Sequence, residues 1–169
     1  MEVIIVLATI IGLVTGLIQI AIWLKHSLEQ KKWFRKAKKY NTELVAVGIV
    51  VKGSDVLMVK RSKPEENLGW QFPAAQVRSK QEVYSRITNE TLAETGVDTK
   101  FHRILGERKH PDTKKYVVYV ALNYLKGEPQ NGQPQENSIV RWVNIKDAKM
   151  LLTSNLSIDV NSYISLFEE

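Results

Sequence analysis

The sequence predicts an α/β domain, an α/β/α sandwich built on a mixed sheet, that is preceded by one transmembrane helix. Residues 3–24 carry no charged side chain over 22 consecutive positions. From residue 44 onward, short segments rich in β-branched residues alternate with segments whose apolar residues recur at helical spacing, as in strands interleaved with helices. The chain is therefore expected to comprise a transmembrane helix (1–24), a basic juxtamembrane stalk (25–43) and one globular domain (44–169).

The apolar run has the length of a membrane span. A helix of 22 residues is about 33 Å long, and the hydrocarbon core of a bilayer is about 30 Å thick. Trp23 lies at the end of the run, where an amphipathic ring favours the membrane interface. Cations follow from Lys25 onward, and the positive-inside rule assigns that side to the cytoplasm. We expect a single-pass protein with a short N-terminus outside and the globular domain in the cytoplasm.

A signal peptide and a buried core helix are the two alternatives for this run. A signal peptide carries its positive charge before the apolar run and a small-residue cleavage site after it. Here Met1 and Glu2 precede the run, and the bulky Trp23 and Leu24 end it. A buried helix of 22 residues would be long for a globular protein. Both alternatives fit the sequence less well than a membrane span.

Small residues recur every four positions along the run, at Ala8, Gly12 and Gly16. They share one helix face and allow a second helix to approach closely, as in associating membrane helices. Gln19 lies near this face and could form a hydrogen bond across it. The pattern predicts a homo-oligomer. Glycine is common in any membrane helix, so a simple anchor is the alternative.

Positive charge is confined to the stalk. The formal net charge is +6, and residues 25–40 contain seven cations and one anion, which leaves 17 cations and 17 anions elsewhere. The globular part is therefore neutral, and we expect no nucleic-acid polymer as a partner. The stalk cations either rest on anionic lipid headgroups or act only as a topology signal. The absence of cysteine excludes disulfides, thiolate metal sites and cysteine nucleophiles.

The strands and helices of the globular part follow in order. Strands are expected at 44–51 and 56–60, joined by a turn of sequence Lys-Gly-Ser-Asp. A helix is expected at 82–94, because Val83, Ile87, Thr91 and Leu92 are spaced for one inward face and Gly96 is placed as a C-cap. Further strands are expected at 101–106, 116–124 and 139–143, helices at 146–152 and 156–167, and a Gly/Pro/Gln loop at 127–135.

Two stretches of this domain resemble the Nudix hydrolases. Residues 70–73 (Trp-Gln-Phe-Pro) and 93–97 (Ala-Glu-Thr-Gly-Val) resemble the flanks of the Nudix box, G-x5-E-x7-R-E-U-x-E-E-x-G-U with U apolar, which a Phe-Pro dipeptide usually precedes. Glu90 and Gly96 set the register. The resemblance continues through 105–111, 116–119 and 140–143 and covers about residues 46–164. It implies a Nudix-type α/β/α sandwich like that of small bacterial nucleoside-triphosphate-type members.

Several box positions carry other residues. The resemblance places Ala75 at the box glycine, Gln81 at the first glutamate, Asn89 at the arginine and Ala93 at the first of the paired glutamates. Nudix enzymes are known to cleave a diphosphate linked to a nucleoside or similar group, using several Mg²⁺ ions held by clustered carboxylates. Only Glu90 and Glu94 remain, four positions apart on one helix face, as candidate metal ligands. We expect weak Mg²⁺ binding at most; the alternative for both residues is a solvated helix face.

Other polar and aromatic residues are candidates for binding a nucleotide ligand. An arginine can clamp a phosphate and an aromatic ring can stack on a base. For Trp70 the alternative is core packing, and for His110, which precedes a proline, it is a structural turn. Glu136 lies where Nudix proteins often carry a further acidic residue. The complete set is Arg61, Trp70, Gln76, Gln81, Arg108, His110 and Glu136.

Three functions fit these features. The first is a nucleotide-binding membrane effector, because the layout resembles the transmembrane-Nudix effectors of bacterial cyclic-oligonucleotide (CBASS) anti-phage systems. That resemblance implies a cyclic oligonucleotide messenger as ligand and the bacterial inner membrane as location. The second is a membrane-tethered, Mg²⁺-dependent pyrophosphohydrolase acting on nucleoside-diphosphate-linked substrates with a variant metal site. The third is a partner protein that uses the fold as an interaction surface. Fold alone does not choose among them.

Overall fold

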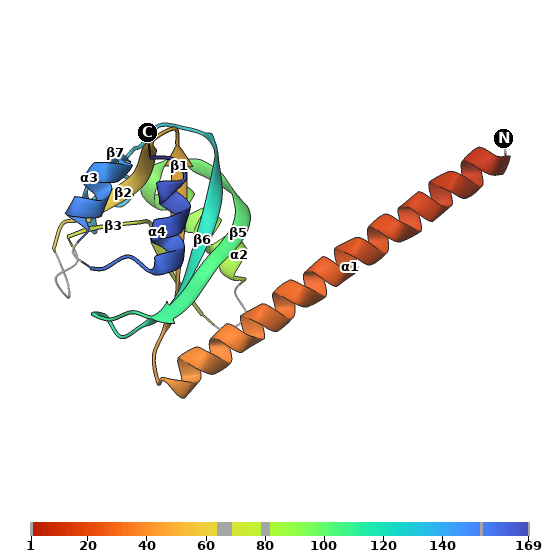
Figure 1. The fold of residues 1–169 in the computed structure, drawn as a ribbon, viewed down its shortest axis with the longest axis horizontal. Coiled ribbons are helices and arrows are strands. Elements are labelled where there is room, and N and C mark those ends of the chain that lie inside the picture. Colours follow the sequence, from red (N-terminus) through yellow and green to blue (C-terminus); the bar gives the residue numbers. More distant parts are fainter. Residues whose placement is uncertain (1, 64–68, 79–81, 153, 169) are drawn as a thin grey trace.

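The computed structural model describes residues 2–63, 69–78, 82–152 and 154–168. One long helix, α1 (Glu2–Lys39), extends away from a domain in which a sheet carries shorter helices (Figure 1). The shorter helices are α2 (Val83–Thr95), α3 (Ile145–Leu151) and α4 (Ile158–Ser165). The strands are β1 (Leu44–Lys52), β2 (Asp55–Arg61), β3 (Trp70–Gln71), β4 (Ala74–Val77), β5 (Asp98–Lys109), β6 (Tyr116–Lys126) and β7 (Asn137–Asn144).

The sheet is mixed, as the sequence predicts. Its central path runs β3-β2-β1-β6-β5, while β4 pairs with β1 and β7 pairs with β2. Strands β1 and β6 are parallel, and the other pairings are antiparallel. One end of β1 lies beside β4 and the other beside β2, so the sheet divides around this strand. This division leaves an opening next to the N-terminal half of β1.

Alternate residues of the central strands face two separate cores. In β6, Val118 and Val120 pack in a core that also contains Val83 and Ile87 of α2. Val117, Tyr119 and Ala121 of the same strand face the other side, where α3 and α4 contribute Ile145, Ala148, Val160 and Ile164. Helices thus cover both faces of the sheet, and the predicted α/β/α sandwich is confirmed.

The predicted elements agree closely with the observed ones, with three differences. Leu92 was expected on the buried face of α2 and is instead 46% exposed, because the buried positions continue from Thr91 to Glu94 and Thr95. Strand β5 is about twice as long as expected, because it follows β6 through three register shifts. Strands β3 and β4 were not predicted: they are too short to show periodicity and Pro73 lies between them. Gly96 caps α2 with a φ of 71°, as expected.

Helix α1 combines an exposed apolar part with a docked basic part. The apolar part has the length and composition of a candidate membrane span, and its side chains are not buried in the domain. Gly12 and Gly16 lie on it with open space around them, and Ala8 lies one turn earlier. Toward its C-terminal end the helix contributes Trp33 and Ala37 to the core. The basic segment is therefore packed on the sandwich.

Candidate functional site

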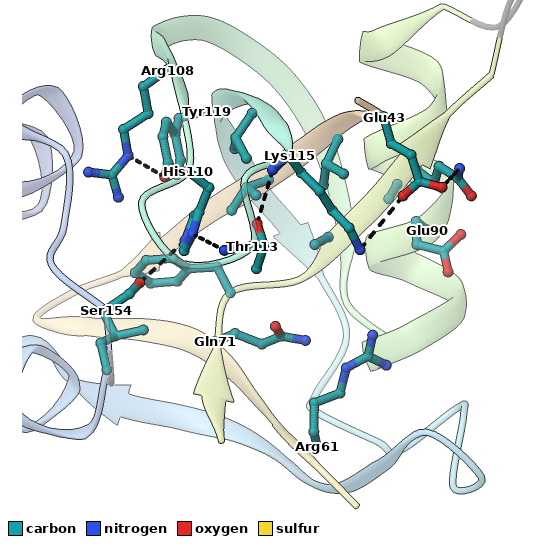
Figure 2. Close-up of a pocket in the computed structure, with 18 of the residues that line it drawn as sticks. Glu43, Arg61, Gln71, Glu90, Arg108, His110, Thr113, Lys115, Tyr119 and Ser154 are labelled. Atoms are coloured by element: carbon teal, nitrogen blue, oxygen red, sulfur yellow. Dashed lines mark hydrogen bonds and ion pairs between the residues drawn. The ribbon is translucent and has the colours of Figure 1, made fainter. Parts of the chain in front are cut away.

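A cleft of 410 Å³ opens beside the N-terminal half of β1. Its walls come from β1, the end of β2, β3, β4, the exposed side of α2, the end of β5 with the turn that follows it, and residues 152 and 154–156 before α4. Arg61 and Arg108 lie on opposite sides of the opening (Figure 2). Most of the predicted site residues line this one cleft: Arg61, Trp70, Gln76, Glu90, Arg108, His110 and Glu136. Gln81 lies outside the described residues.

Glu90 is held on both sides. Its Oε2 atom is 2.5 Å from Nη1 of Arg86, one helical turn earlier on α2. Its Oε1 atom accepts a hydrogen bond of 3.0 Å from Nε2 of Gln133. Arg86 is anchored a second time, because its Nε donates to the backbone oxygen of Gln76 on β4 at 3.4 Å. The Glu90 carboxylate therefore already has a cationic partner within the protein.

Glu94 lies behind the cleft rather than on its wall. It is only 3% exposed, and its Oε1 accepts a hydrogen bond of 2.8 Å from Nδ2 of Asn137, which is also buried. Burial raises the pKa of Glu94 to about 7, although the Asn137 hydrogen bond and the charge of Arg61 act in the opposite direction. A carboxyl group with this pKa changes between its neutral and its charged form near neutral pH. The alternative of a solvated helix face is wrong for Glu94.

The 127–136 loop brings the amide partners of both glutamates to α2. Its backbone caps the C-terminal end of the helix: Gln130 N donates to the oxygen of Thr95 and Gly132 N to the oxygen of Glu94. A Cβ atom at position 132 would lie 1.9 Å from the Ala93 oxygen, so this approach requires glycine. The loop then places Gln133 against Glu90 and leads into Asn137.

Cationic groups surround the open part of the cleft. Arg61 pairs with Glu136 through Nη1 and Oε2 at 2.6 Å. Arg108 donates from Nε to the Tyr119 hydroxyl at 3.0 Å and from Nη2 to a backbone oxygen at 2.6 Å. Lys115 lies 3.6 Å from Glu43 on the far wall. These ion pairs are partly exposed, so the cations can exchange their protein partners for an anionic ligand.

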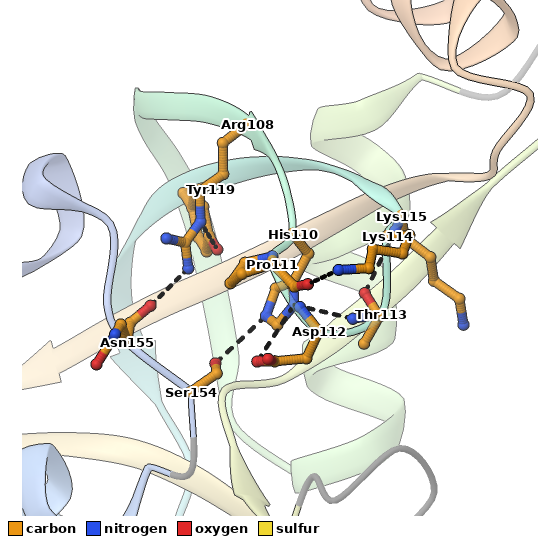
Figure 3. Close-up of polar contacts among 10 residues, drawn as sticks. All are labelled: Arg108, His110, Pro111, Asp112, Thr113, Lys114, Lys115, Tyr119, Ser154 and Asn155. Carbon is orange, nitrogen blue, oxygen red and sulfur yellow. Dashed lines mark hydrogen bonds and ion pairs between the residues drawn. The ribbon is translucent and has the colours of Figure 1, made fainter.

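His110 serves the turn that the sequence suggested and also lines the cleft. Its Nδ1 accepts from the backbone N–H groups of Asp112 and Thr113, each at 3.3 Å (Figure 3). An Nδ1 atom that accepts hydrogen bonds carries no proton, so the neutral ring is protonated at Nε2. Nε2 lies 3.3 Å from the Ser154 hydroxyl and can donate to it. The ring thus joins the 110–115 turn to the segment before α4.

Trp70 has a packing role together with its place on the cleft wall. Its ring packs against the core beneath α3 and α4, and the Arg141 guanidinium lies 4.9 Å from the ring centroid. The ring is half-buried, so part of it remains open to the cleft. Gln76 of β4 donates a hydrogen bond of 2.6 Å to Oε1 of Glu43, the residue before β1. This bond fixes the Gln76 side chain.

The carboxylates of this region do not fit a magnesium cluster. Mg²⁺ requires several hard oxygen ligands in near-octahedral geometry. Glu90 is occupied by Arg86 and Gln133, and Glu94 is buried with a raised pKa. Ala93 presents only a methyl group at an exposed position of the same helix. Among the residues that the structure describes, no three His, Cys, Asp or Glu side chains gather as a metal site.

Sequence reasoning missed three charged residues of the cleft: Glu43, Arg86 and Lys115. A signal for Arg86 was available, because an arginine four positions before a glutamate on a helix predicts an ion pair. No comparable signal existed for Glu43 and Lys115. They lie 72 positions apart and meet only because β1 and β6 pair in parallel.

Comparisons with known proteins agree with this fold. A family model described as NUDIX domain matches residues 42–162, whereas no protein of curated function matches the chain. The chain is similar to an ADP-ribose pyrophosphatase from Streptococcus suis (TM-score 0.54, 18% identity, 73% of this chain and 87% of that chain). It is also similar to a Nudix hydrolase from Nitrosomonas europaea (0.61, 16%, 73% and 70%) and to a MutT Nudix hydrolase from Burkholderia pseudomallei (0.56, 19%, 73% and 96%). At these identities the structural likeness concerns the fold alone.

Proposed function

We propose, because the chain belongs to the Nudix family, that it is a membrane-anchored nucleotide-binding protein whose cleft holds the phosphate groups of its ligand and hydrolyses them slowly or not at all. The observation that carries the proposal is the ring of cations over an open cleft. Arg61, Arg108 and Lys115 line it together with Arg86. Guanidinium and ammonium groups in partly enclosed positions bind phosphate oxygens through charge-assisted hydrogen bonds.

The state of the carboxylates supports slow hydrolysis. Nudix hydrolases usually use divalent metals such as Mg²⁺, which neutralise the charge that develops as the diphosphate is attacked. In this chain the box positions at 81 and 93 are Gln and Ala. The two remaining carboxylates are engaged by Arg86 and by Asn137. We therefore expect the cleft to keep nucleotide binding and to lose most of its turnover.

Helix α1 is the basis for proposing that the protein is anchored in a membrane. Its apolar part is unburied and is followed directly by cations, which supports a single span with the domain in the cytoplasm, beneath a bacterial inner membrane. Ala8, Gly12 and Gly16 support association of these spans into a homo-oligomer. The role as a membrane effector of anti-phage defence, with a cyclic oligonucleotide as messenger, rests on the layout of span and domain.

A membrane-tethered, Mg²⁺-dependent pyrophosphohydrolase with a variant metal site is the second candidate, and one observation favours it. Glu90 and Glu94 keep two of the acidic positions of the Nudix box on one helix. Hydrolase relatives such as the ADP-ribose pyrophosphatase share the fold. If the ligand displaced Arg86 from Glu90, the carboxylate would become available to a metal ion. A partner protein without a nucleotide ligand is the third candidate.

Ligand-induced thermal stabilisation separates the nucleotide-binding protein from the partner protein that has no nucleotide ligand. The full chain in detergent is heated with ADP-ribose, nucleoside triphosphates and cyclic dinucleotides in turn, because a ligand that binds the folded state raises the melting temperature. Arg61→Ala should weaken the shift, and Arg35→Ala, an exposed arginine of α1, is the matched control. The absence of any shift across the panel would favour the partner protein.

Hydrolysis of the same panel is measured with and without Mg²⁺. We expect at most weak turnover, and a gain after Gln81→Glu and Ala93→Glu restore two carboxylates. Wild-type turnover above about 1 s⁻¹, an ordinary enzyme rate, would favour the hydrolase instead.

A further inference from the structure

We propose that the Arg86 guanidinium takes the place of a divalent metal ion, so that the cleft binds diphosphate groups without metal. The inference rests on the proposed function, because it concerns how the same cleft holds phosphate. Beyond nucleotide binding, we assign Arg86 as a phosphate-binding residue, and we expect that this binding requires no metal ion. The ligand class is a nucleotide whose diphosphate is contacted by Arg86 from the side of α2.

The position of Arg86 is set by two contacts. Its Nη1 lies 2.5 Å from Oε2 of Glu90, and its Nε donates to the backbone oxygen of Gln76. The first contact ties the guanidinium to α2 and the second ties it to β4, so both walls orient it. Arg86 and Glu90 both line the cleft, and the Arg86 side chain is 34% exposed. A ligand in the cleft can therefore reach the guanidinium.

A metal ion cannot share this position with Arg86. A guanidinium keeps its charge at all physiological pH values, so it cannot lose a proton to make room for a cation. Mg²⁺ would have to replace Arg86 at Oε2 of Glu90 and Gln133 at Oε1. The ion would gain few oxygen ligands by this exchange, because the Ala93 side chain has no oxygen and Glu94 is buried. The ion pair thus occupies Glu90, the carboxylate of the two remaining box positions that lines the cleft.

The guanidinium retains donors for a ligand. Arginine has five N–H groups in a planar fork, a geometry that matches two phosphate oxygens. Within the part of the chain that the structure describes, Arg86 contacts Glu90 through Nη1 and Gln76 through Nε, so its Nη2 group can donate to a ligand. Arg61 lines the same cleft as Arg86 and Glu90. Two guanidinium groups near one opening can hold two adjacent phosphates.

A simple surface ion pair is the alternative explanation for Arg86 and Glu90. Such i, i+4 pairs are common on exposed helices and do little there. This pair differs in its surroundings, because the Glu90 side chain is only 14% exposed and carries a third partner, Gln133, from a distant loop. The Glu90 carboxylate is therefore enclosed by contacts from α2 and from the loop, and it is not a solvated surface group.

Calorimetric titration with ADP-ribose tests the inference on the full chain in detergent, once with excess EDTA and once with Mg²⁺. Wild type should bind equally well in both. Arg86→Ala should bind at least about tenfold more weakly in EDTA. The same variant should regain affinity with Mg²⁺, because Glu90 is released. It should also bind Mn²⁺ alone, a gain that wild type lacks and that adding Glu90→Gln to Arg86→Ala abolishes. Arg35→Ala is the control, and circular dichroism establishes that each variant is folded.

Three results would count against the inference. Wild-type binding that appears only with Mg²⁺ would overturn metal-free recognition and leave the proposed nucleotide binding intact. Arg86→Ala that matches wild type in EDTA and binds no Mn²⁺ would reduce Arg86 to a surface ion pair. Absence of binding for ADP-ribose in both buffers, together with no response to any nucleotide of the panel, would remove the proposed function itself.

Discussion

Replacing Trp33 by alanine should strongly destabilise the globular domain, although this residue lies on the same helix as the candidate membrane span. Trp33 is only 3% exposed, belongs to the core between the sheet and α2, and packs edge-on against Tyr84 with ring centroids 6.2 Å apart. Removal of a buried tryptophan side chain costs about 3–5 kcal/mol. For a domain of this size about 1 kcal/mol lowers the melting temperature by about 3 °C, so we expect a fall of about 10 °C or more.

Thermal unfolding of the full chain in detergent, followed by circular dichroism, measures this effect. Trp23→Ala is the matched control, because Trp23 is a tryptophan of the same helix that is 61% exposed. We expect the control to leave the melting temperature of the domain unchanged. If Trp33→Ala and Trp23→Ala behave alike, α1 is not docked on the sandwich in the way described, and the basic segment is a free linker.

Three further predictions concern the membrane, the span and the buried carboxyl group. A reporter fused after Glu169 should be active only in the cytoplasm; periplasmic activity would reverse the topology. Gly12→Leu should abolish oligomerisation in detergent, measured by light scattering, without changing nucleotide binding, because a bulky side chain prevents close helix approach. Unchanged oligomers would make the span a simple anchor. Burial raises the pKa of Glu94 from 4.5 to about 7, so its contribution to stability is complete below about pH 4.5 and is lost as the pH rises through 7. Glu94→Gln should remove this part of the pH dependence in urea unfolding series between pH 4.5 and 8; a parallel profile for both proteins would exclude Glu94 as the titrating group.

The docking of α1 connects the candidate membrane span directly to α2, the helix that lines the cleft. His26 packs on Tyr84 with ring centroids 4.5 Å apart, and Glu29 accepts a hydrogen bond of 3.1 Å from the Tyr84 hydroxyl. Lys32 and Lys36 pair with Glu107 on β5, which lowers the pKa of that carboxyl group against the opposing effect of burial. Tyr84 begins the same helix that carries Arg86 and Glu90. A ligand that preferred one position of α2 could therefore bias the position of α1.

The sequence by itself determined the features that depend on near neighbours in the chain. The uncharged run before Lys25, the turn at Gly53 and the cap at Gly96 follow from local chemistry, because charge, helical spacing and a positive φ are properties of a few adjacent residues. The resemblance to the Nudix box then set the register of α2, which is why Arg61, Glu90 and His110 could be assigned to one region before the structure was known.

Only the tertiary structure decided which partner each charged group has. Gln133 and Asn137 reach Glu90 and Glu94 across 43 positions of sequence, and Lys36 reaches Glu107 across 71. Periodicity cannot predict such pairs, because it describes which face a residue occupies and not what lies opposite that face. The charge that a side chain can offer to a ligand or a metal depends on which partner in the protein already neutralises it. For Glu90 the sequence already places Arg86 one helical turn away, whereas only the packing of the 127–136 loop supplies Gln133 as the second partner.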